Sequence, residues 1–323
     1  MNGMITVAKK SNNIDFIKYS YSIGVRDFRL NMDYEKEAYE SIELIQSLKL
    51  EDAKIFADYQ GVKMRIQLKD GIDEIKCSVG DTLFIYNSEI SYPYISNYYL
   101  VQSLVKVGNV IRFADDKIEG VVKQICDDGV WIKLTKVEYV LRQNAGCCIL
   151  GEDVPSPHMT KDICQKISNT KAIRENLVDW VILSFVENAE EIQNFVIEMH
   201  KKGIWVMAKI ETDKGVENID SIGLIVDGFM IGRGDLKNTT KEDFDSYYMQ
   251  AICKISKFTS RYNGVGTFFL AKYSQTLELT EDQVEEILNV KKNNFNYIML
   301  SKEVVNSKYP YEAIAKLQQI CQN

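Results

Sequence analysis

Eight short apolar runs alternate with eight amphipathic runs, and this alternation constrains the fold more than any other feature of the chain. The apolar runs are rich in β-branched residues and are predicted to be strands: Met4–Ala8, Asp27–Asn31, Ile55–Asp58, Trp180–Phe185, Trp205–Ile210, Gly228–Ile231, Val265–Phe269 and Tyr297–Leu300. The amphipathic runs have the apolar spacing of helices: Ile14–Ile23, Glu35–Leu48, Lys161–Glu175, Ala189–Lys202, Gly215–Ile222, Lys241–Arg261, Glu281–Lys291 and Tyr311–Gln319. Eight strand–helix pairs predict a (β/α)8 barrel.

The predicted barrel is interrupted once. Between residues 66 and 154, strand-length runs such as VGDTLFIY and VGNVIRFADD are separated by Gly and Asp turns, without a helical pattern. We therefore predict an α/β fold in two parts: a (β/α)8 barrel of residues 1–65 and 155–323, and a small all-β domain, residues 66–154, inserted after the third strand. An insertion there lies at the active-site end of a barrel, where it can act as a lid. A doubly wound open sheet is the alternative, although its usual glycine fingerprint is missing.

Charge and hydropathy exclude several classes of protein. The chain has 39 basic and 46 acidic side chains, and its net charge of −7 disfavours a nucleic-acid partner, because phosphate binding requires a basic surface. No run of about 18 uncharged apolar residues is present, so we expect no membrane-spanning helix. The N-terminal segment lacks an apolar stretch of signal-peptide length, and we expect a cytoplasmic protein.

The available residue types limit the kind of metal site. The 7 cysteines include no C-x-x-C pair and the chain has 2 histidines, which excludes a zinc site built on Cys and His. A metal here should be a hard cation bound by oxygen. Glu211 and Asp235 are the best candidates, because they follow neighbouring predicted strands and Mg²⁺ usually takes one or two carboxylates. The simpler interpretation is a pair of solvated loop acids.

Polar residues gather where the predicted strands end, which is where barrel enzymes place catalytic groups. Seven strand ends carry them: Arg29 and Asn31, Asp58, Ser184, Lys209 and Glu211, Arg233 to Asp235, Thr267, and Ser301 with Glu303. Any one of these is ordinary at the start of a loop, but the repeated pattern favours an active site. Lys209 precedes Glu211 by two positions, so both would face the barrel mouth. A cation beside a metal suits an enolate or a phosphoryl group in transfer, and the amides of the GRGDL turn suit a carboxylate or phosphate.

Seven segments together resemble the pyruvate kinase family: RLN at 29–31, ADYQGVKMR at 57–65, VGDTLFIY at 79–86, VDWVILSF at 178–185, AKIETDKGVENID at 208–220, VDGFMIGRGDL at 226–236 and YIMLSKEVVNSKYPYEAI at 297–314. The similarity keeps the family's order and covers its barrel and lid domains. It ends where the barrel ends, so the family's C-terminal domain, with one of its subunit contacts, is expected to be absent. This leaves a homodimer as an open alternative.

The resemblance implies a role for each matching position. It places Arg29 and Ser184 at the phosphoryl group and Lys209 at the phosphoryl and enolate oxygens. It gives Gly234, Asp235 and Thr267 a part in substrate binding, and Thr267 and Ser301 a part in proton relay. It makes Glu211 and Asp235 the ligands of Mg²⁺ or Mn²⁺. The implied substrates are phosphoenolpyruvate and pyruvate, with ADP and ATP as the nucleotide partners.

The resemblance also bears on the monovalent cation. Positions that bind K⁺ in the family read Asn31, Asp33, Asp58 and Tyr59, and the family's glutamate in D-T-K-G-P-E-I-R is Lys63. Members with lysine there are generally independent of K⁺. We therefore expect that K⁺ is not required, because Lys63, held by Asp33 and Asp58, supplies the charge; a surface lysine is the plainer alternative.

The departures from the family fall mainly on the nucleotide side. A nucleotide-side histidine reads Tyr34, the lysines of the loop at the lid's exit are lost in RQNAG at 142–146, and a glycine after M-L-S reads Lys302. The leading hypothesis is phosphoryl transfer between phosphoenolpyruvate and a nucleotide, or an altered acceptor. The alternatives are a metal-dependent lyase or aldolase acting on a 2-oxo acid or enolpyruvate, and a non-catalytic relative that binds phosphoenolpyruvate.

Overall fold

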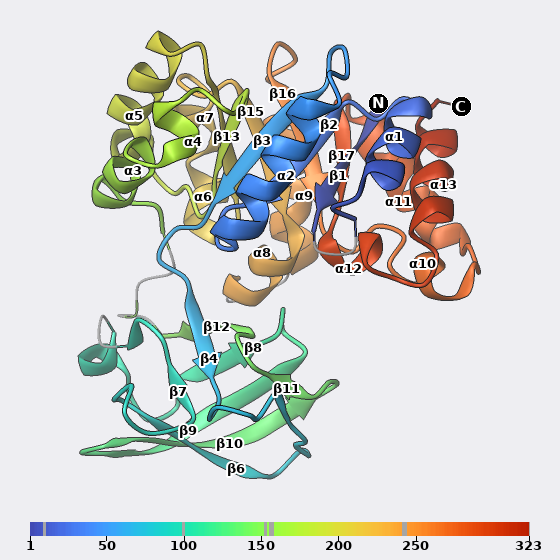
Figure 1. Ribbon diagram of the computed structural model, residues 1–323. Helices are drawn as coiled ribbons and strands as arrows, with labels where there is room; N and C mark the ends of the chain where they lie inside the picture. The colour runs from blue at the N-terminus through green and yellow to red at the C-terminus, as the bar shows by residue number, and fades with distance from the viewer. Residues whose placement is uncertain (9–10, 99–100, 152–153, 155–157, 241–243, 323) are drawn as a thin grey trace.

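The computed structural model describes residues 1–8, 11–98, 101–151, 154, 158–240 and 244–322. Eight parallel strands close into a barrel (Figure 1), in the order β1 (Asn2–Val7), β17 (Tyr297–Leu300), β16 (Tyr262–Gly266), β15 (Gly228–Gly232), β14 (Trp205–Ile210), β13 (Trp180–Leu183), β3 (Lys54–Tyr59) and β2 (Asp27–Asn31). The closed parallel sheet confirms the predicted barrel and excludes the open sheet.

Helices surround this barrel on its outer side (Figure 1). They are α1 (Ile14–Ser22), α2 (Glu35–Ser47), α3 (Lys161–Ser168), α4 (Lys171–Arg174), α5 (Ala189–Lys201), α6 (Asp213–Glu217), α7 (Ile219–Ile222), α8 (Arg233–Thr239), α9 (Phe244–Ile255), α10 (Tyr273–Thr276), α11 (Glu281–Lys292), α12 (Lys302–Val305) and α13 (Pro310–Gln322). Several begin at a side-chain cap, as at Asn13, whose oxygen accepts a hydrogen bond from the amide of Phe16 at 2.8 Å. The start of the predicted helix 241–261 lies outside the described residues.

The seventh strand lies three residues earlier than predicted. β16 covers Tyr262–Gly266 instead of Val265–Phe269, because Thr267 and Phe268 take positive φ angles of 73° and 68° that end the strand. Asn and Gly within YNGVG have low strand preference, so the sequence pattern favours a strand over the aromatic and β-branched residues that follow. The correction places Thr267 directly after the strand end.

The inserted domain is a second, smaller closed barrel, drawn below the first in Figure 1. Its strands are β4 (Met64–Gln67), β6 (Thr82–Tyr86), β7 (Tyr94–Ile95), β8 (Val110–Phe113), β9 (Ile118–Cys126), β10 (Gly129–Val137) and β12 (Gly146–Leu150), with β5 (Glu74–Ile75) and β11 (Leu141–Arg142) paired beside them. It also contains the short 3-10 helix η2 (Gln102–Leu104). An all-β insertion after the third strand is confirmed. Its boundaries at 65/66 and 154/155 stay a prediction, and residues 155–157 lie outside the described part of the chain.

The interior of the large barrel is apolar and supports the polar layer above it. Met4, Phe56, Ile182, Met207, Met230, Tyr297 and Met299 form one buried cluster, separate from the core between strands and helices. Successive inward-facing residues on a strand are two positions apart. Phe56 and Met207 are therefore followed, one layer higher, by Asp58 and Lys209. Among the described helices, none is long and apolar enough to cross a membrane.

Candidate functional site

The polar layer of the barrel centres on Asp58, a carboxylate that is 1% exposed. It accepts hydrogen bonds from Nε and Nη2 of Arg29 at 3.0 and 2.7 Å, and from the hydroxyl of Ser184 at 3.1 Å. The ammonium of Lys209 lies 3.7 Å from Asp58 and 2.8 Å from Glu211. Residues from four predicted strand ends therefore meet in one place.

Glu211 is fixed by backbone groups of its neighbours. Its Oε2 accepts a hydrogen bond from the amide of Phe185 at 3.1 Å. A Cβ atom on Gly232, at the end of β15, would lie 2.4 Å from Oε1 of Glu211. Only glycine leaves room for this carboxylate, which points across the strand end toward the turn that carries Asp235.

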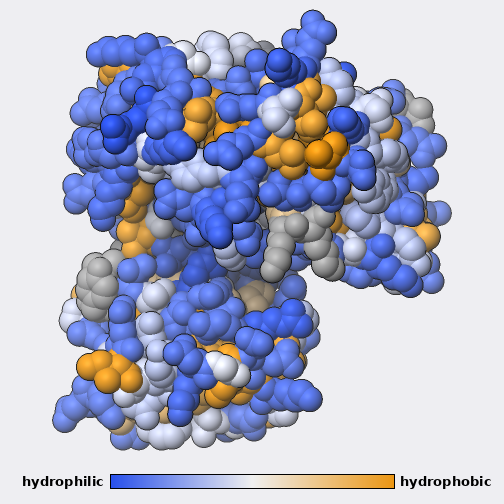
Figure 2. Space-filling model, in the orientation of Figure 1, coloured by the Kyte–Doolittle hydropathy of each residue, from blue (hydrophilic) through white to orange (hydrophobic). Residues whose placement is uncertain are grey.

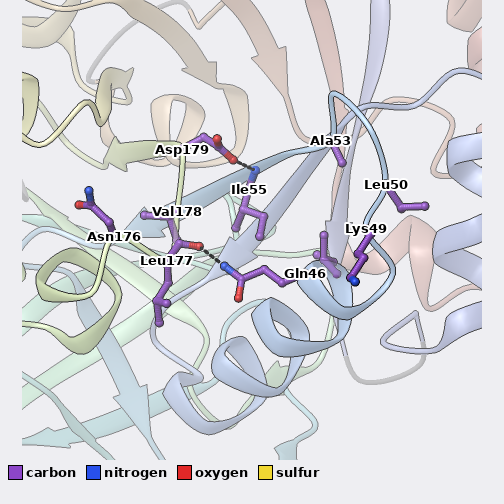
Figure 3. Close-up of a pocket in the computed structure, with 10 residues that line it drawn as sticks. Gln46, Lys49, Leu50, Ala53, Ile55, Asn176, Leu177, Val178 and Asp179 are labelled. Atoms are coloured by element: carbon purple, nitrogen blue, oxygen red, sulfur yellow. Dashed lines mark hydrogen bonds between the residues drawn. The ribbon is translucent and has the colours of Figure 1, made fainter.

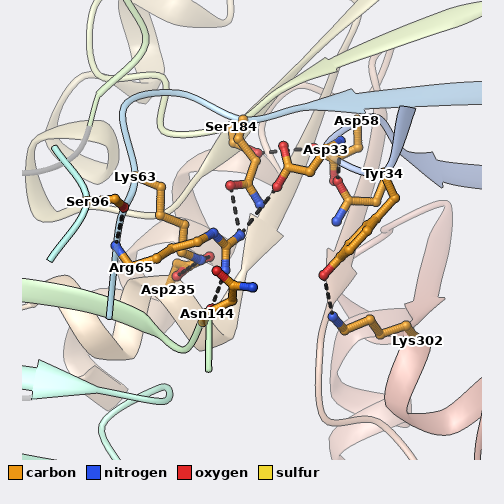
Figure 4. A network of polar contacts seen from close by, with 12 residues as sticks. Asp33, Tyr34, Asp58, Lys63, Arg65, Ser96, Asn144, Ser184, Asp235 and Lys302 are labelled. Atoms are coloured by element: carbon orange, nitrogen blue, oxygen red, sulfur yellow. Dashed lines mark hydrogen bonds and ion pairs between the residues drawn. The ribbon is translucent and has the colours of Figure 1, made fainter. Parts of the chain in front are cut away.

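Lys63 lies beside Asp235, which corrects the expected pairing. Its ammonium contacts the two carboxylate oxygens of Asp235 at 2.5 and 2.7 Å (Figure 4). Asp58 is bound by Arg29 and Lys209, and Asp33 lies 3.4 Å from Arg65 instead. Nothing in the sequence pattern indicated that Lys63 reaches across the barrel mouth to Asp235, which follows β15.

Burial and nearby charges set the protonation of the two acids. Burial raises the pKa of Glu211 to about 7, against the opposing effect of Lys209, and Asp235 raises it further. Burial also acts to raise the pKa of Asp235, but Lys63 and Lys209 outweigh it and hold that pKa below its ordinary value. Lys209 itself stays protonated, because Asp58 and Glu211 more than offset its burial and raise its pKa.

This arrangement fits a divalent cation at Glu211 and Asp235. The two carboxyl groups lie close enough to interact, and each already contacts an ammonium, Glu211 that of Lys209 at 2.8 Å and Asp235 that of Lys63 at 2.5 and 2.7 Å. A divalent cation bound by their oxygens would share these carboxylates with the two lysines. No group of three or more Asp, Glu, His or Cys residues that could hold a metal occurs among the described residues. Mg²⁺ does not need one, since it usually keeps several waters and substrate oxygens.

The lid brings a further carboxyl group, that of Asp115, to the site, and the sequence pattern did not predict it. The carboxyl group of Asp115 lies so close to Gly234 that a Cβ atom there would be 3.2–3.3 Å from its atoms. Ala114, Asp115 and Asp116 all have positive φ, which is unusual for three consecutive residues without glycine. The adjacent acids of FADD, at a turn between two strands, were the only sequence signal.

The lid also contacts the C-terminal end of α8. Nη1 of Arg112, on β8, donates hydrogen bonds to the carbonyls of Lys237 and Thr240 at 3.2 and 2.7 Å. Asp116 lies 3.2 Å from Nε of Arg112 and 3.9 Å from the ammonium of Lys237. The lid is therefore hydrogen-bonded to the C-terminal end of the helix that carries Gly234 and Asp235, and Asp115 of the lid lies beside its first turn.

The remaining predicted residues line the same cleft, which has a volume of about 390 Å³. Thr267, Ser301, Asn31 and Gly234 face it together with Arg29, Lys63, Lys209, Glu211 and Asp235. Figure 2 shows hydrophilic side chains where the two barrels meet. Asp58 and Ser184 lie behind this lining, and Asp33 is partly exposed at its edge.

A smaller pocket of about 160 Å³ adjoins the cleft on the side of Tyr34 and Lys302. Arg29 and Asn31 line both spaces. The ammonium of Lys302 lies 3.4 Å from the hydroxyl of Tyr34, so the two side chains meet over this pocket (Figure 4). These are two of the positions at which the sequence is expected to depart from the family.

Another pocket, of about 240 Å³, lies at the opposite end of the barrel, where β3 and β13 begin. Gln46 donates a hydrogen bond to the carbonyl of Leu177 at 3.2 Å, and the amide of Ile55 donates one to Asp179 at 2.8 Å (Figure 3). The first contact ties α2 to the segment before β13, and the second ties the start of β3 to that of β13. Residues at this end of a barrel usually serve stability, and we place no chemistry there.

Comparison with known proteins identifies the family. The family model for the pyruvate kinase barrel domain matches residues 3–314. The chain belongs to the pyruvate kinase family. The pyruvate kinase of Clostridium perfringens is 25% identical, over 98% of this chain and 68% of that protein. The pyruvate kinase of Thermotoga maritima is 26% identical, over 98% of this chain and 69% of that protein.

The chain is shorter than its pyruvate kinase relatives. It spans 69% of the Thermotoga protein and 55% of pyruvate kinase 2 from Synechocystis. The crystal structure of Cryptosporidium parvum pyruvate kinase superimposes with a TM-score of 0.85 at 23% identity, covering 99% of this chain and 69% of that chain. This likeness establishes the fold shared with pyruvate kinases, including the inserted lid.

Proposed function

We propose that the protein transfers a phosphoryl group between phosphoenolpyruvate and an acceptor with the help of Mg²⁺ or Mn²⁺, forming pyruvate. The observation that carries this proposal is the position of Lys209, whose ammonium lies between Asp58 and Glu211 at 3.7 and 2.8 Å. A buried, permanently charged ammonium at the mouth of a barrel suits the oxygens of a moving phosphoryl group and an enolate.

Arg29 is the second cation of the proposed site. Two hydrogen bonds to Asp58 fix its guanidinium, and Ser184 fixes Asp58 from the other side. We assign Ser184 this orienting role, in place of direct contact with phosphate. Holding the cations before substrate arrives lowers the cost of reorganisation during transfer.

Glu211 and Asp235 would hold the divalent cation, which supplies positive charge to the phosphoryl and carboxylate oxygens when bound. The amide of Gly234 would receive the substrate carboxylate at the start of the turn. Thr267 and Ser301 line the same cleft and would carry the proton to the enolate carbon. Asp115 must leave Gly234 for the carboxylate to bind, which makes lid movement part of the proposed cycle.

The acceptor is the open part of the proposal. The family favours ADP, but Tyr34 and Lys302 cover the pocket beside Arg29, which favours a changed acceptor or binding without turnover. A lyase is less well supported. It would need a general base, and neither histidine is among the described residues that line the cleft. His200 pairs with Asp227 at 2.8 Å and is 42% exposed.

The direct test follows phosphoenolpyruvate by ³¹P and ¹H NMR with Mg²⁺ and each nucleoside diphosphate in turn. Pyruvate that forms only with a diphosphate supports the kinase, and pyruvate that forms only with another added acceptor supports the altered acceptor. Substrate binding without any pyruvate supports the non-catalytic relative and contradicts the proposal.

Lys209→Met tests the residue assignment in the same assay. We expect loss of turnover with retained folding. Lys54→Met is the matched control, because Lys54 forms a 3.7 Å ion pair with Asp179 at the opposite end of the barrel. An active Lys209→Met protein would refute the role of Lys209.

A further inference from the structure

Thr267 has a backbone conformation that its side chain disfavours. Its φ is 73° and that of Phe268 is 68°, so two consecutive residues without glycine lie in the left-handed region. A β-branched residue there is a clear outlier. Such outliers persist only where surrounding contacts hold them, and they cluster at functional sites.

The contact that holds this turn comes from Arg233, the first residue of α8. Its Nε donates to the carbonyl of Thr267 at 3.0 Å and, more weakly, to that of Gly266 at 3.3 Å, while its Nη2 also donates to the Thr267 carbonyl. The direction of the Thr267 carbonyl sets the backbone angle of the turn. Because χ1 of threonine is stiff, it also sets where the hydroxyl points.

Arg233 is itself held rigidly. Arg233 is 4% exposed, and its guanidinium lies 3.8 Å from the ring centroid of Phe269. Its Nη1 contacts a carboxylate oxygen of Glu286 on α11. A planar guanidinium can bind two carbonyls and a carboxylate at once, whereas a lysine ammonium cannot match that fork. The Arg233–Glu286 pair thus fixes the turn from the side away from the cleft.

We propose that Arg233, supported by Glu286, is a positioning residue that aims the Thr267 hydroxyl into the active cleft. It joins two strand-end turns, because Arg233 adjoins Gly234 and Asp235 while its side chain binds the turn after β16. This inference rests on the proposed function of Thr267 in the phosphoenolpyruvate site.

The test is a double-mutant cycle of Arg233→Lys and Thr267→Ala, read as kcat for pyruvate formation. We expect Arg233→Lys to lower kcat by about 10²-fold, the scale of a misplaced catalytic group. In the Thr267→Ala background, the same change should add little, because both substitutions remove one function. Multiplying effects in the double variant would overturn the proposal.

Arg26→Lys is the matched control. Arg26 also stacks on an aromatic ring, 3.9 Å from the centroid of Tyr21, and also binds backbone carbonyls, but it precedes β2 at the far end of the barrel. It should cost a similar loss of thermal stability and leave kcat unchanged. If Arg233→Lys fails to fold, Glu286→Gln replaces it, since the Glu286 side chain is 37% exposed.

A methyl ¹³C spectrum of labelled threonine separates this inference from the proposed function. The Thr267 signal should shift in Arg233→Lys or Glu286→Gln and stay in place in Arg26→Lys. If the native protein forms no pyruvate, the proposed function fails, and this signal alone decides the positioning role. An unshifted Thr267 signal would overturn it, whether or not the protein turns over.

Discussion

The ammonium of Lys302 lies 3.4 Å from the phenolic oxygen of Tyr34, although 268 positions separate the two residues in the chain. It also lies 5.3 Å from the centroid of the Tyr34 ring. Two of the positions at which the sequence is expected to depart from the family are thus in contact. Together they form one wall of the smaller pocket, beside Arg29 and Asn31.

Restoring the family residues should reopen this wall. We expect the double variant Tyr34→His, Lys302→Gly to bind ADP more tightly than the native protein, because the Lys302 side chain is removed and the Tyr34 phenol is replaced by a smaller imidazole. Isothermal titration with ADP and Mg²⁺ measures the change, and each single variant should have a smaller effect. Unchanged ADP affinity in the double variant would show that this pair does not control the acceptor.

Lys63 should make the protein independent of K⁺. Its ammonium, 2.5 Å from Asp235, brings a tethered positive charge to the site. Turnover should therefore be equal in K⁺ and in tetramethylammonium, whereas Lys63→Met should turn over faster when K⁺ is added. Strict dependence of the native protein on K⁺ would refute this role of Lys63.

Arg112 should keep the lid on the barrel. Its hydrogen bonds to the carbonyls of Lys237 and Thr240 cross between the domains, so Arg112→Ala should loosen the lid with little loss of barrel stability. We expect faster amide hydrogen exchange in α8 and a KM for phosphoenolpyruvate raised several-fold. Asn87→Ala is the control, because Asn87 donates a hydrogen bond to the carbonyl of Asp127 at 2.9 Å within the lid. Equal exchange in both variants would contradict the clamp.

Asp27 should make stability fall as the pH rises. Burial raises its pKa from 3.8 to about 6, against the hydrogen bond from Tyr262. The folded state therefore keeps a proton that the unfolded state releases, and stability is lost between about pH 4 and 6. Asp27→Asn should match the native protein near pH 4 and exceed it by up to about 3 kcal/mol at pH 7. Urea unfolding measures this, and a pH-independent difference would contradict it.

The sequence predicted which residues meet in the site, because the alternation of side chains along a strand and the position where a strand ends both follow from local patterns. Lys209 and Glu211 share a face by spacing alone, and Asp58 and Lys209 meet because parallel strands align their carboxyl ends. β16 was misplaced because Tyr262–Gly266 is buried inside the barrel wall, where packing overrides the low strand preference of Asn and Gly.

Contacts between residues that are distant in the chain, at the junction of the two domains, could not be predicted from the sequence. The partner of Lys63 depends on where the chain leaves β3 for the lid, and the position of Asp115 depends on how the lid sits on α8. Neither follows from periodicity. The Arg233 contact was hidden for a related reason, since a left-handed turn at Thr267 has no signature in VGTFFL.

Binding of Mn²⁺ followed by electron paramagnetic resonance tests the central claim most directly, because it needs no acceptor. We predict that one Mn²⁺ binds per chain, that Glu211→Gln or Asp235→Asn abolishes this binding, and that Mg²⁺ competes for the site. Asp179→Asn, at the opposite end of the barrel, should leave the affinity unchanged. Stoichiometric Mn²⁺ binding that survives both Glu211→Gln and Asp235→Asn would contradict the account.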